Sequence, residues 1–281
     1  MKVFYETRFS YFGRSGWKSH ASTNPEELFA PDRLDFRFRL FEQIALRSLS
    51  DQQDEDFTLL VLTSKLMPKP YRRQLRELCG DVLGERAQIL VKPPKMAARI
   101  FHWGVRKLSG GEDWVAHVVL DDDDAVSHDF THACKFEARQ IIDNPHAKDP
   151  CAFLSFSRGL TLGIEDGRPN WVTWRNVPYT NLGLAFIAPP DHKKNPFNVP
   201  HLKVGKLFPT RVINTSRPYY IRAVHDMNDS RANVRDERFS AGEIAESFQH
   251  FPLLRQWFDE TGSAFRRKHR AEADMPLLAA E

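Results

Sequence analysis

The sequence contains little cysteine and no long apolar segment. Its three cysteines, Cys79, Cys134 and Cys151, are scattered and form no Cys-x-x-Cys pair. This argues against a disulfide framework and against a structural zinc site. No run reaches the roughly eighteen apolar residues of a membrane-spanning helix. The opening MKVFYETRFS also lacks the apolar core of a signal peptide. We therefore expect a cytoplasmic protein in which the cysteines are small core residues.

The chain also lacks a strong excess of charge of either sign. Its formal net charge is +3, and the basic residues are spread along the chain except for FRRKHR at residues 265–270. A nucleic-acid binder normally carries a denser basic stripe with a recognisable motif, so we expect no nucleic-acid partner. The basic run is typical of a solvated tail over residues 263–281. The alternative is peripheral contact with an anionic membrane, where each Lys or Arg contributes about 1 kcal/mol.

The first half of the chain alternates strand and helix patterns. Apolar runs predict strands at residues 3–9, 57–63, 87–92 and 114–120. Steps of three and four between apolar residues predict helices at residues 31–50, 71–79 and 95–108. Such alternation is typical of an α/β fold with a mostly parallel sheet and crossover helices.

After residue 150 the sequence changes character. Short β-rich runs at residues 152–156, 171–174, 184–188 and 217–224 are separated by Gly, Pro and Asn. A capping-box pattern at residue 240 begins a last helix. The length allows one sizeable core or one domain with a small appendage. We expect a single domain over residues 1–262, with a nucleotide-binding half (1–127) and a loop-rich, β-containing half (128–262).

Four consecutive aspartates, Asp121, Asp122, Asp123 and Asp124, follow the strand at residues 114–120. They should lie at the carboxyl edge of the sheet, where open α/β sheets bind ligands. In an extended chain Asp121 and Asp123 point to one side and Asp122 and Asp124 to the other. Two charges about 4 Å apart interact by roughly 4 kcal/mol at a protein surface. The cluster therefore predicts a site for Mg²⁺ or Mn²⁺. The alternative is a solvated turn or a cap for a helix at 128–143.

The order of these patterns resembles GT-A glycosyltransferases, whose strand ends in Asp-x-Asp after three strand–helix units. More specifically, the chain resembles a bacterial family of rhamnosyltransferases. The matching segments are TRFSYFG (7–13), LFAPDRLDFRFRLFE (28–42), SLSDQQDEDFTLLVLTS (48–64), LDDDDAV (120–126) and VHDMNDSR (224–231), and together they span about residues 1 to 260.

The resemblance implies a GT-A-like fold with helices on both faces of the sheet. It implies that Asp121 and Asp123 bind a divalent cation, with Asp124 continuing the motif and the late histidine, His225, as a further ligand. The donor would be a nucleoside-diphosphate sugar, with rhamnose the first sugar to test. The acceptor would be a glycan, a cell-surface polysaccharide or a lipid-linked sugar. A metal Lewis acid would stabilise the departing diphosphate.

Further polar residues are candidates for donor contacts. Asp122 belongs to the aspartate cluster, and Asn228, Ser230 and Arg231 follow His225. Arg8 ends the first strand, and Lys95 and Arg99 lie one turn apart at the start of the third helix. The alternatives are a surface ion pair for Arg8 and an exposed helix face for Lys95 and Arg99.

An inverting transferase needs a carboxylate base to deprotonate its acceptor. We favour Asp166, in the loop GIEDGRPNW at residues 163–171, over Glu165 and Asp191. Trp171 and Trp174 could stack on a sugar, although tryptophans on a strand more often belong to the core. Glu-Asp-Gly is also a good hairpin turn, and a retaining enzyme needs no such base.

Two other functions compete with this one. Asp122-x-Asp124-x-Val126 fits the nucleophile motif of haloacid-dehalogenase-type phosphatases, although that motif usually lies on the first strand. A protein that binds nucleotide sugars or glycans without catalysis is the other alternative. Release of phosphate from sugar phosphates would favour the first, and absence of any donor hydrolysis would favour the second.

Overall fold

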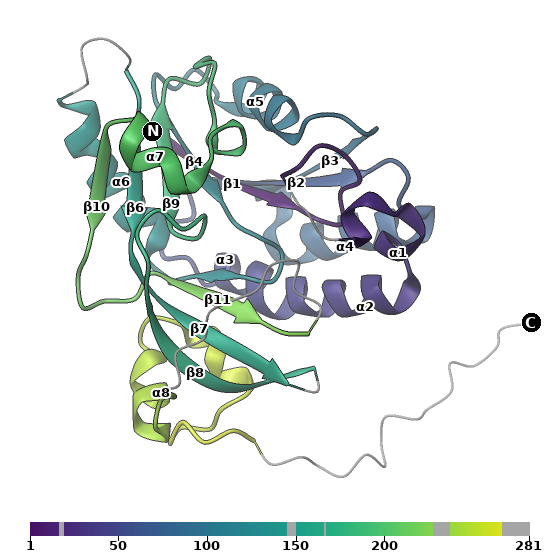
Figure 1. Ribbon diagram of the computed structural model, residues 1–281, viewed down its shortest axis with the longest axis vertical. Coiled ribbons are helices and arrows are strands. Elements are labelled where there is room, and N and C mark those ends of the chain that lie inside the picture. Colours follow the sequence, from purple (N-terminus) through teal and green to yellow (C-terminus); the bar gives the residue numbers. More distant parts are fainter. Residues whose placement is uncertain (17–19, 145–149, 166, 227–236, 266–281) are drawn as a thin grey trace, which may run out of the picture.

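The computed structural model describes residues 1–16, 20–144, 150–165, 167–226 and 237–265 (Figure 1). In these ranges the central sheet has seven strands in the order β10-β6-β9-β4-β1-β2-β3. Their bounds are β1 Lys2–Arg8, β2 Phe57–Ser64, β3 Ala87–Lys92, β4 Val115–Val119, β6 Ala152–Phe156, β9 Leu184–Ala188 and β10 Thr210–Ile213. Only β9 runs antiparallel to its neighbours among these described strands. The predicted mostly parallel α/β sheet is therefore confirmed.

Helices cover both faces of this sheet. Successive side chains of β1 point to opposite faces and include apolar ones on both, so each face must be covered. Val3 and Tyr5 share a core with α2 (Pro31–Leu40), α4 (Lys69–Leu83) and α6 (Phe130–Ile142). Phe4 points the other way and packs against α5 (Ala97–Leu108). Figure 1 shows α5 on one side of the sheet and α2 on the other.

A second sheet follows in the order β5-β11-β7-β8 within the described residues. Its strands are β5 Ala125–Val126, β7 Arg158–Glu165, β8 Arg168–Asn176 and β11 Tyr220–Val224. This sheet packs against α8 (Ala241–Ser247), the 3₁₀ turn η6 (Pro252–Gln256), and Leu40 and Ile44. Because β4 belongs to the first sheet and β5 to the second, the four aspartates between them lie where the two sheets meet.

The remaining elements refine the predicted boundaries. The predicted helix 31–50 is continuous but contains a π-helical segment, as α2, η2 (Phe41–Leu46) and α3 (Arg47–Ser50). The predicted strand 171–174 is part of the longer hairpin β7–β8, and β10 was not predicted. The short elements are η1 Ala21–Thr23, α1 Pro25–Leu28, η3 Gly84–Arg86, η4 Pro196–Asn198, η5 His201–Lys203 and α7 Val204–Leu207.

The cysteines and helix lengths agree with the composition. Cys79, Cys134 and Cys151 are buried and unpaired by disulfides. Burial raises the pKa of the Cys79 and Cys134 thiols to about 12, as expected for core residues. In the part of the chain that the structure describes, no helix combines the length and apolar character needed to cross a bilayer.

Candidate functional site

The four aspartates form a turn rather than an extension of β4. The amide of Asp124 donates to the carbonyl of Asp121 over 3.2 Å, and β5 begins at the next residue. The chain is therefore not extended here, and the division of the carboxylates between two sides that an extended strand would produce does not apply. The chain must turn here to pass from one sheet to the other, and each carboxylate meets a different partner.

Asp121 is the most exposed of the four and binds Arg8. A guanidinium nitrogen of Arg8 donates to Oδ1 of Asp121 over 2.7 Å. Arg8 is itself buried, bonds the carbonyl of Ser15 and lies 5.1 Å from the ring centre of Phe197. The end of β1 thus delivers Arg8 to the aspartate turn, as the sequence position of Arg8 predicts.

Asp122 is fully buried and forms an ion pair with Arg37 of α2. Nε of Arg37 donates to one carboxylate oxygen over 3.0 Å, and a second guanidinium nitrogen contacts the other oxygen. Asp122 has no exposed surface and does not line the cavity beside the turn. It is therefore placed to hold the turn on α2 and not as the accessible nucleophile that the phosphatase alternative requires.

Asp123 lies between Arg37 and His225. Nε2 of His225 lies 2.9 Å from Oδ2 of Asp123, and Arg37 contacts the same oxygen at 3.4 Å. Burial alone would raise the pKa of Asp123, but the Arg37 charge and the hydrogen bond and charge of His225 lower this pKa to about 2. Asp123 is therefore an ionised carboxylate over the whole physiological range.

Asp124 has the opposite electrostatic environment. Its Oδ1 accepts a hydrogen bond from the amide of Ala223 on β11 over 2.9 Å. Burial and the neighbouring charges of Asp123 and Asp121 raise the pKa of Asp124 well above its usual value. The two adjacent carboxyl groups therefore differ in their affinity for protons.

A cavity of about 730 Å³ opens beside the turn. Asp121, Asp123 and Asp124 contribute carboxyl groups to its wall. Cationic or titratable groups also line it, and they are Arg8, Arg37, Arg222 and His201. The segment 196–200 also lines the cavity. The cavity therefore combines acidic groups with several cations, and the arginines suit a phosphate-bearing ligand.

The sequence reasoning missed the cavity wall formed by η4 and its surroundings. Asn195 caps η4 by accepting from the amide of Phe197, and its side chain donates to the carbonyl of Ala98 over 2.6 Å. Phe197 stacks on Phe101 of α5. The motif Asn-Pro-Phe-Asn is a capping box and is the signal that could have marked this segment as ordered.

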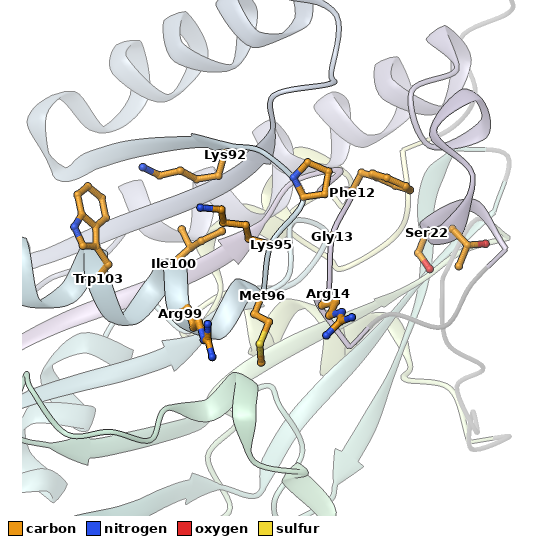
Figure 2. A pocket seen from close by; sticks show the side chains of 12 residues that line it. Phe12, Gly13, Arg14, Ser22, Lys92, Lys95, Met96, Arg99, Ile100 and Trp103 are labelled. Atoms are coloured by element: carbon orange, nitrogen blue, oxygen red, sulfur yellow. The ribbon is translucent and has the colours of Figure 1, made fainter.

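Lys95 and Arg99 lie in a different cavity, of about 1070 Å³ (Figure 2). The amide of Arg14 donates to the carbonyl of Lys95, and Arg14 lines this cavity whereas Ser15 lines the aspartate cavity. Lys95 and Arg99 therefore line the neighbouring cavity and not the aspartate cavity, and both side chains are exposed.

The residues predicted for acid–base and phosphate contacts are only partly described. Asp166, Asn228, Ser230 and Arg231 lie outside the described residues. Glu165 accepts hydrogen bonds from Trp171 Nε1 over 2.8 Å and from Asn170 over 2.6 Å, and neither Glu165 nor Asp191 lines the aspartate cavity.

The two tryptophans of β8 pack against other residues of the second half of the chain. Trp171 is 9% exposed, and its ring lies so close to Gly163 that a Cβ there would collide with it. Trp174 packs on Phe239 and carries the guanidinium of Arg158 at 4.2 Å from its ring centre. Both rings therefore have protein partners, as the core interpretation of these tryptophans predicts.

The donor groups at the turn fit a cation that is shared with a ligand. Among the described residues, no group of three or more His, Cys, Asp or Glu side chains is arranged to hold a metal ion. Asp121 and Asp123 nevertheless offer two carboxylates to the cavity. Mg²⁺ is commonly bound by one or two carboxylates and completes its shell with waters and substrate phosphates. The donor set thus suits such a shared site and not a closed protein cage.

Two solved structures of S. aureus TarS are similar to this protein. The complex of TarS residues 1–349 with UDP is 13% identical, with 80% of this chain and 61% of that chain covered and a TM-score of 0.42. The complex with UDP-GlcNAc is also 13% identical, with 91% and 65% covered and a TM-score of 0.41. In a further TarS structure the match covers 37% of the TarS chain. This chain therefore spans less than two thirds of the TarS chains that it matches.

Comparison of the sequence with known protein families identifies the family of this chain. No curated protein matches the chain. The family described as "Putative rhamnosyl transferase" matches residues 3–237. Since this match includes the aspartate turn, His225 and most of the chain, the protein belongs to that family.

Proposed function

We propose that the protein is a GT-A-type glycosyltransferase that takes a sugar from a nucleoside-diphosphate donor. The observation that carries the proposal is the aspartate cavity, where the ionised Asp123 and the ion-paired Asp121 face Arg8, Arg222 and His201. Membership in the rhamnosyltransferase family supports rhamnose as the first sugar to test. A glycan, a cell-surface polysaccharide or a lipid-linked sugar is the proposed acceptor.

The cations around the cavity have a clear task in such a reaction. The diphosphate gains negative charge as the bond to the sugar breaks, and fixed positive groups stabilise that charge without reorganising. Arg8 is held in place by Asp121 and Ser15, so its guanidinium is pre-oriented. Arg222 lies on β11 and also lines the cavity. We propose that these two arginines bind the diphosphate of the donor.

We further propose that Mg²⁺ or Mn²⁺ binds with the donor at Asp121 and Asp123. When bound, the cation would act as a Lewis acid on the departing diphosphate. His225 holds the carboxylate of Asp123 through its 2.9 Å contact, so it either positions this ligand or joins it, and Asp124 is a further candidate. Asn228, Ser230 and Arg231 remain proposed phosphate contacts.

Asp166 remains the proposed base for an inverting reaction. Residues 1–127 are proposed to bind the donor and residues 128–262 the acceptor.

The basic run at 265–270 falls outside the described residues after Phe265, and its contact with a membrane stays a prediction.

The test is donor turnover by the purified protein. Nucleoside-diphosphate sugars, beginning with dTDP-L-rhamnose, are incubated with and without Mn²⁺ or Mg²⁺, and release of the nucleoside diphosphate is measured. We expect slow, metal-dependent hydrolysis of one donor in the absence of acceptor. Binding of a donor without any release would instead favour the non-catalytic alternative, and neither binding nor release for any donor would contradict the proposal.

A further inference from the structure

Two segments at one edge of the central sheet carry several basic residues and no acidic residue. Residues 65–76 contain Lys65, Lys69, Arg72, Arg73 and Arg76 and no Asp or Glu. Residues 92–107 contain Lys92, Lys95, Arg99, Arg106 and Lys107 and again no Asp or Glu. The whole chain has 40 basic and 37 acidic residues, so this separation is not a consequence of overall composition. We call residues 65–76 and 92–107 the basic edge.

The fold places these two segments side by side. They follow β2 and β3, the last two strands in the order of the central sheet, and each runs into the next helix, α4 or α5. Ser64 pairs with Lys92 across the two strands, and the amide of Lys65 donates to the carbonyl of Lys92 over 2.8 Å. The two stretches therefore meet where β2 and β3 end, and from there one continues into α4 and the other into α5, on opposite faces of the sheet.

The charges of the basic edge are not neutralised within the fold. Eight of the ten basic side chains are exposed, and only Arg72 and Lys92 are half-buried. Among the described residues, the single ion pair on this edge joins Arg73 to Glu77 at 4.0 Å, and an exposed pair at this distance has little energetic weight. The edge is therefore available to an anionic partner.

Apolar side chains are exposed among these charges. Leu66, Met96 and Trp103 are 52%, 38% and 47% exposed, and they are three of the seven large apolar side chains that are exposed in the described part of the chain. Figure 2 shows Met96 and Trp103 beside Lys92, Lys95 and Arg99 around the cavity of about 1070 Å³. Binding through charge alone does not require exposed apolar side chains. Their presence therefore indicates a partner that also offers apolar surface.

We propose that the basic edge binds the surface of an anionic phospholipid membrane. Lysines and arginines attract anionic headgroups, and tryptophan is favoured at the boundary between headgroups and acyl chains. Leu66, Met96 and Trp103 would enter this boundary while the surrounding cations contact phosphates, and the cavity in Figure 2 has room for headgroups. The combination of exposed apolar and basic groups is what peripheral membrane surfaces share.

Other anionic partners fit the surface less well. Single-stranded nucleic acids bind through stacking of bases on aromatic faces as well as through their phosphates. The ring of Trp103 already carries the ammonium groups of Lys92 at 4.3 Å and Lys107 at 5.4 Å from its centre. An ammonium over the ring obstructs stacking but suits a lipid headgroup, whose phosphate can meet the lysine.

The membrane surface goes beyond the proposed transfer reaction and does not depend on it. The segment that carries Arg14 to the cavity of the basic edge carries Ser15 to the aspartate cavity. A protein bound by this edge would therefore hold the aspartate cavity close to the lipid surface, where a lipid-linked acceptor would lie.

Vesicle flotation of the full chain tests the proposal. Vesicles of phosphatidylcholine, with or without phosphatidylglycerol, are mixed with protein at low and at high salt. We expect binding only to the vesicles with phosphatidylglycerol, weakened by salt. We expect the variant K65Q/K69Q/K92Q/K95Q to bind at least about tenfold more weakly. The matched control K193Q/K194Q/K203Q/K206Q removes the same charge from exposed lysines elsewhere and should bind almost as the unaltered protein does.

Trp103→Ala provides an independent test of the proposed contact between apolar side chains and the membrane. We expect the tryptophan fluorescence of the unaltered protein to shift to the blue on anionic vesicles, and we expect Trp103→Ala to reduce this shift and to weaken vesicle binding. Circular dichroism establishes that each variant is folded. The proposal is overturned by absence of binding to anionic vesicles, by equal weakening in both quadruple variants, by binding to soluble polyanions alone, or by complete loss of vesicle binding on neutralising only Arg266, Arg267, Lys268 and Arg270 of the tail.

Discussion

Arg37 and Asp122 form a buried ion pair that ties helix α2 to the aspartate turn. Arg37 also contacts Asp123 at 3.4 Å, so a single guanidinium compensates two adjacent carboxylates. Removing one partner of a buried pair leaves the other charged and without compensation. The effect can be measured as a change in the free energy of unfolding, without an activity assay.

Replacement of Arg37 by Ala is therefore expected to reduce the free energy of unfolding by about 3–5 kcal/mol. Chemical denaturation monitored by circular dichroism measures the loss. Arg39→Ala, at an exposed position on the same helix, should change the stability by less than about 1 kcal/mol. A stability of Arg37→Ala close to that of Arg39→Ala would show that the ion pair does not hold the turn.

Asp123→Asn should abolish sugar transfer without unfolding the protein. Asparagine keeps the shape of the side chain but removes the charge that faces the cavity, and we expect the rate to fall at least about 100-fold. Donor turnover and circular dichroism are measured together. Asp81→Asn, at an exposed position on α4, is the control and should retain full activity. Full turnover in Asp123→Asn would contradict the role of this carboxylate.

His225→Ala should weaken metal binding or donor turnover, because it removes a contact that holds Asp123. The imidazole contacts Oδ2 of Asp123 at 2.9 Å and contributes to the low pKa of that carboxyl group. Loss of such a supporting contact typically reduces metal affinity or activity by about 10- to 100-fold. Titration of Mn²⁺ followed by thermal shift, together with donor turnover, distinguishes the two effects. His132→Ala, at an exposed position, should change neither.

Metal removal provides a separate prediction. Treatment with EDTA should stop donor turnover, and Mn²⁺ or Mg²⁺ should restore it. The correct donor at a hundred times its dissociation constant should stabilise the fold by about 2.7 kcal/mol. This stabilisation should depend on the metal in the unaltered protein and be lost in Asp121→Asn combined with Asp123→Asn. Turnover that is unchanged by EDTA would remove the cation from the proposal.

Two histidines outside the aspartate turn, His102 and His250, should make the fold sensitive to mild acid. Burial lowers the pKa of His102 and His250, and the positive charges of Arg106 and Arg217 lower them further. In the unfolded chain their pKa is about 6.5. As the pH falls through this value, the unfolded chain binds protons that the folded chain does not bind, and stability declines. The melting temperature should therefore fall between about pH 7.5 and 5.5.

The double variant His102→Asn, His250→Asn should show a smaller fall over the same range, measured by scanning calorimetry. His132→Asn, at an exposed position, should leave the pH dependence unchanged. An identical slope in the double variant and the unaltered protein would exclude these two histidines as the cause.

The strand–helix order was predictable because strands buried on both faces are almost entirely apolar. The run at 57–63 is an example, and β2 is buried along its whole length. The position of the aspartates at the end of β4 followed from the same pattern. Their turn geometry did not, since nothing in the local sequence states that the next strand belongs to a second sheet.

Contacts between distant segments were harder to foresee. His225 lies 102 positions from Asp123 along the chain and was identified only through the family resemblance. Arg37 lies three residues after Leu34 and four before Phe41, on the apolar face of the helix. A cation on that face was the available signal for a buried partner. Periodicity alone describes the apolar face of a helix and does not name the charged residue that lies within it.

The meeting of two sheets at the aspartate turn has a mechanical consequence. Asp123 lies in the turn that leaves β4 of one sheet and enters β5 of the other, and the imidazole of His225 that contacts it follows β11, the strand that pairs with β5. Because β5 pairs with β11 and Asp124 accepts from the amide of Ala223, a shift of the second sheet should carry the turn and the imidazole together. Core substitutions at Leu160 or Ile221 should therefore displace the turn and lower the stability of the fold at the same time.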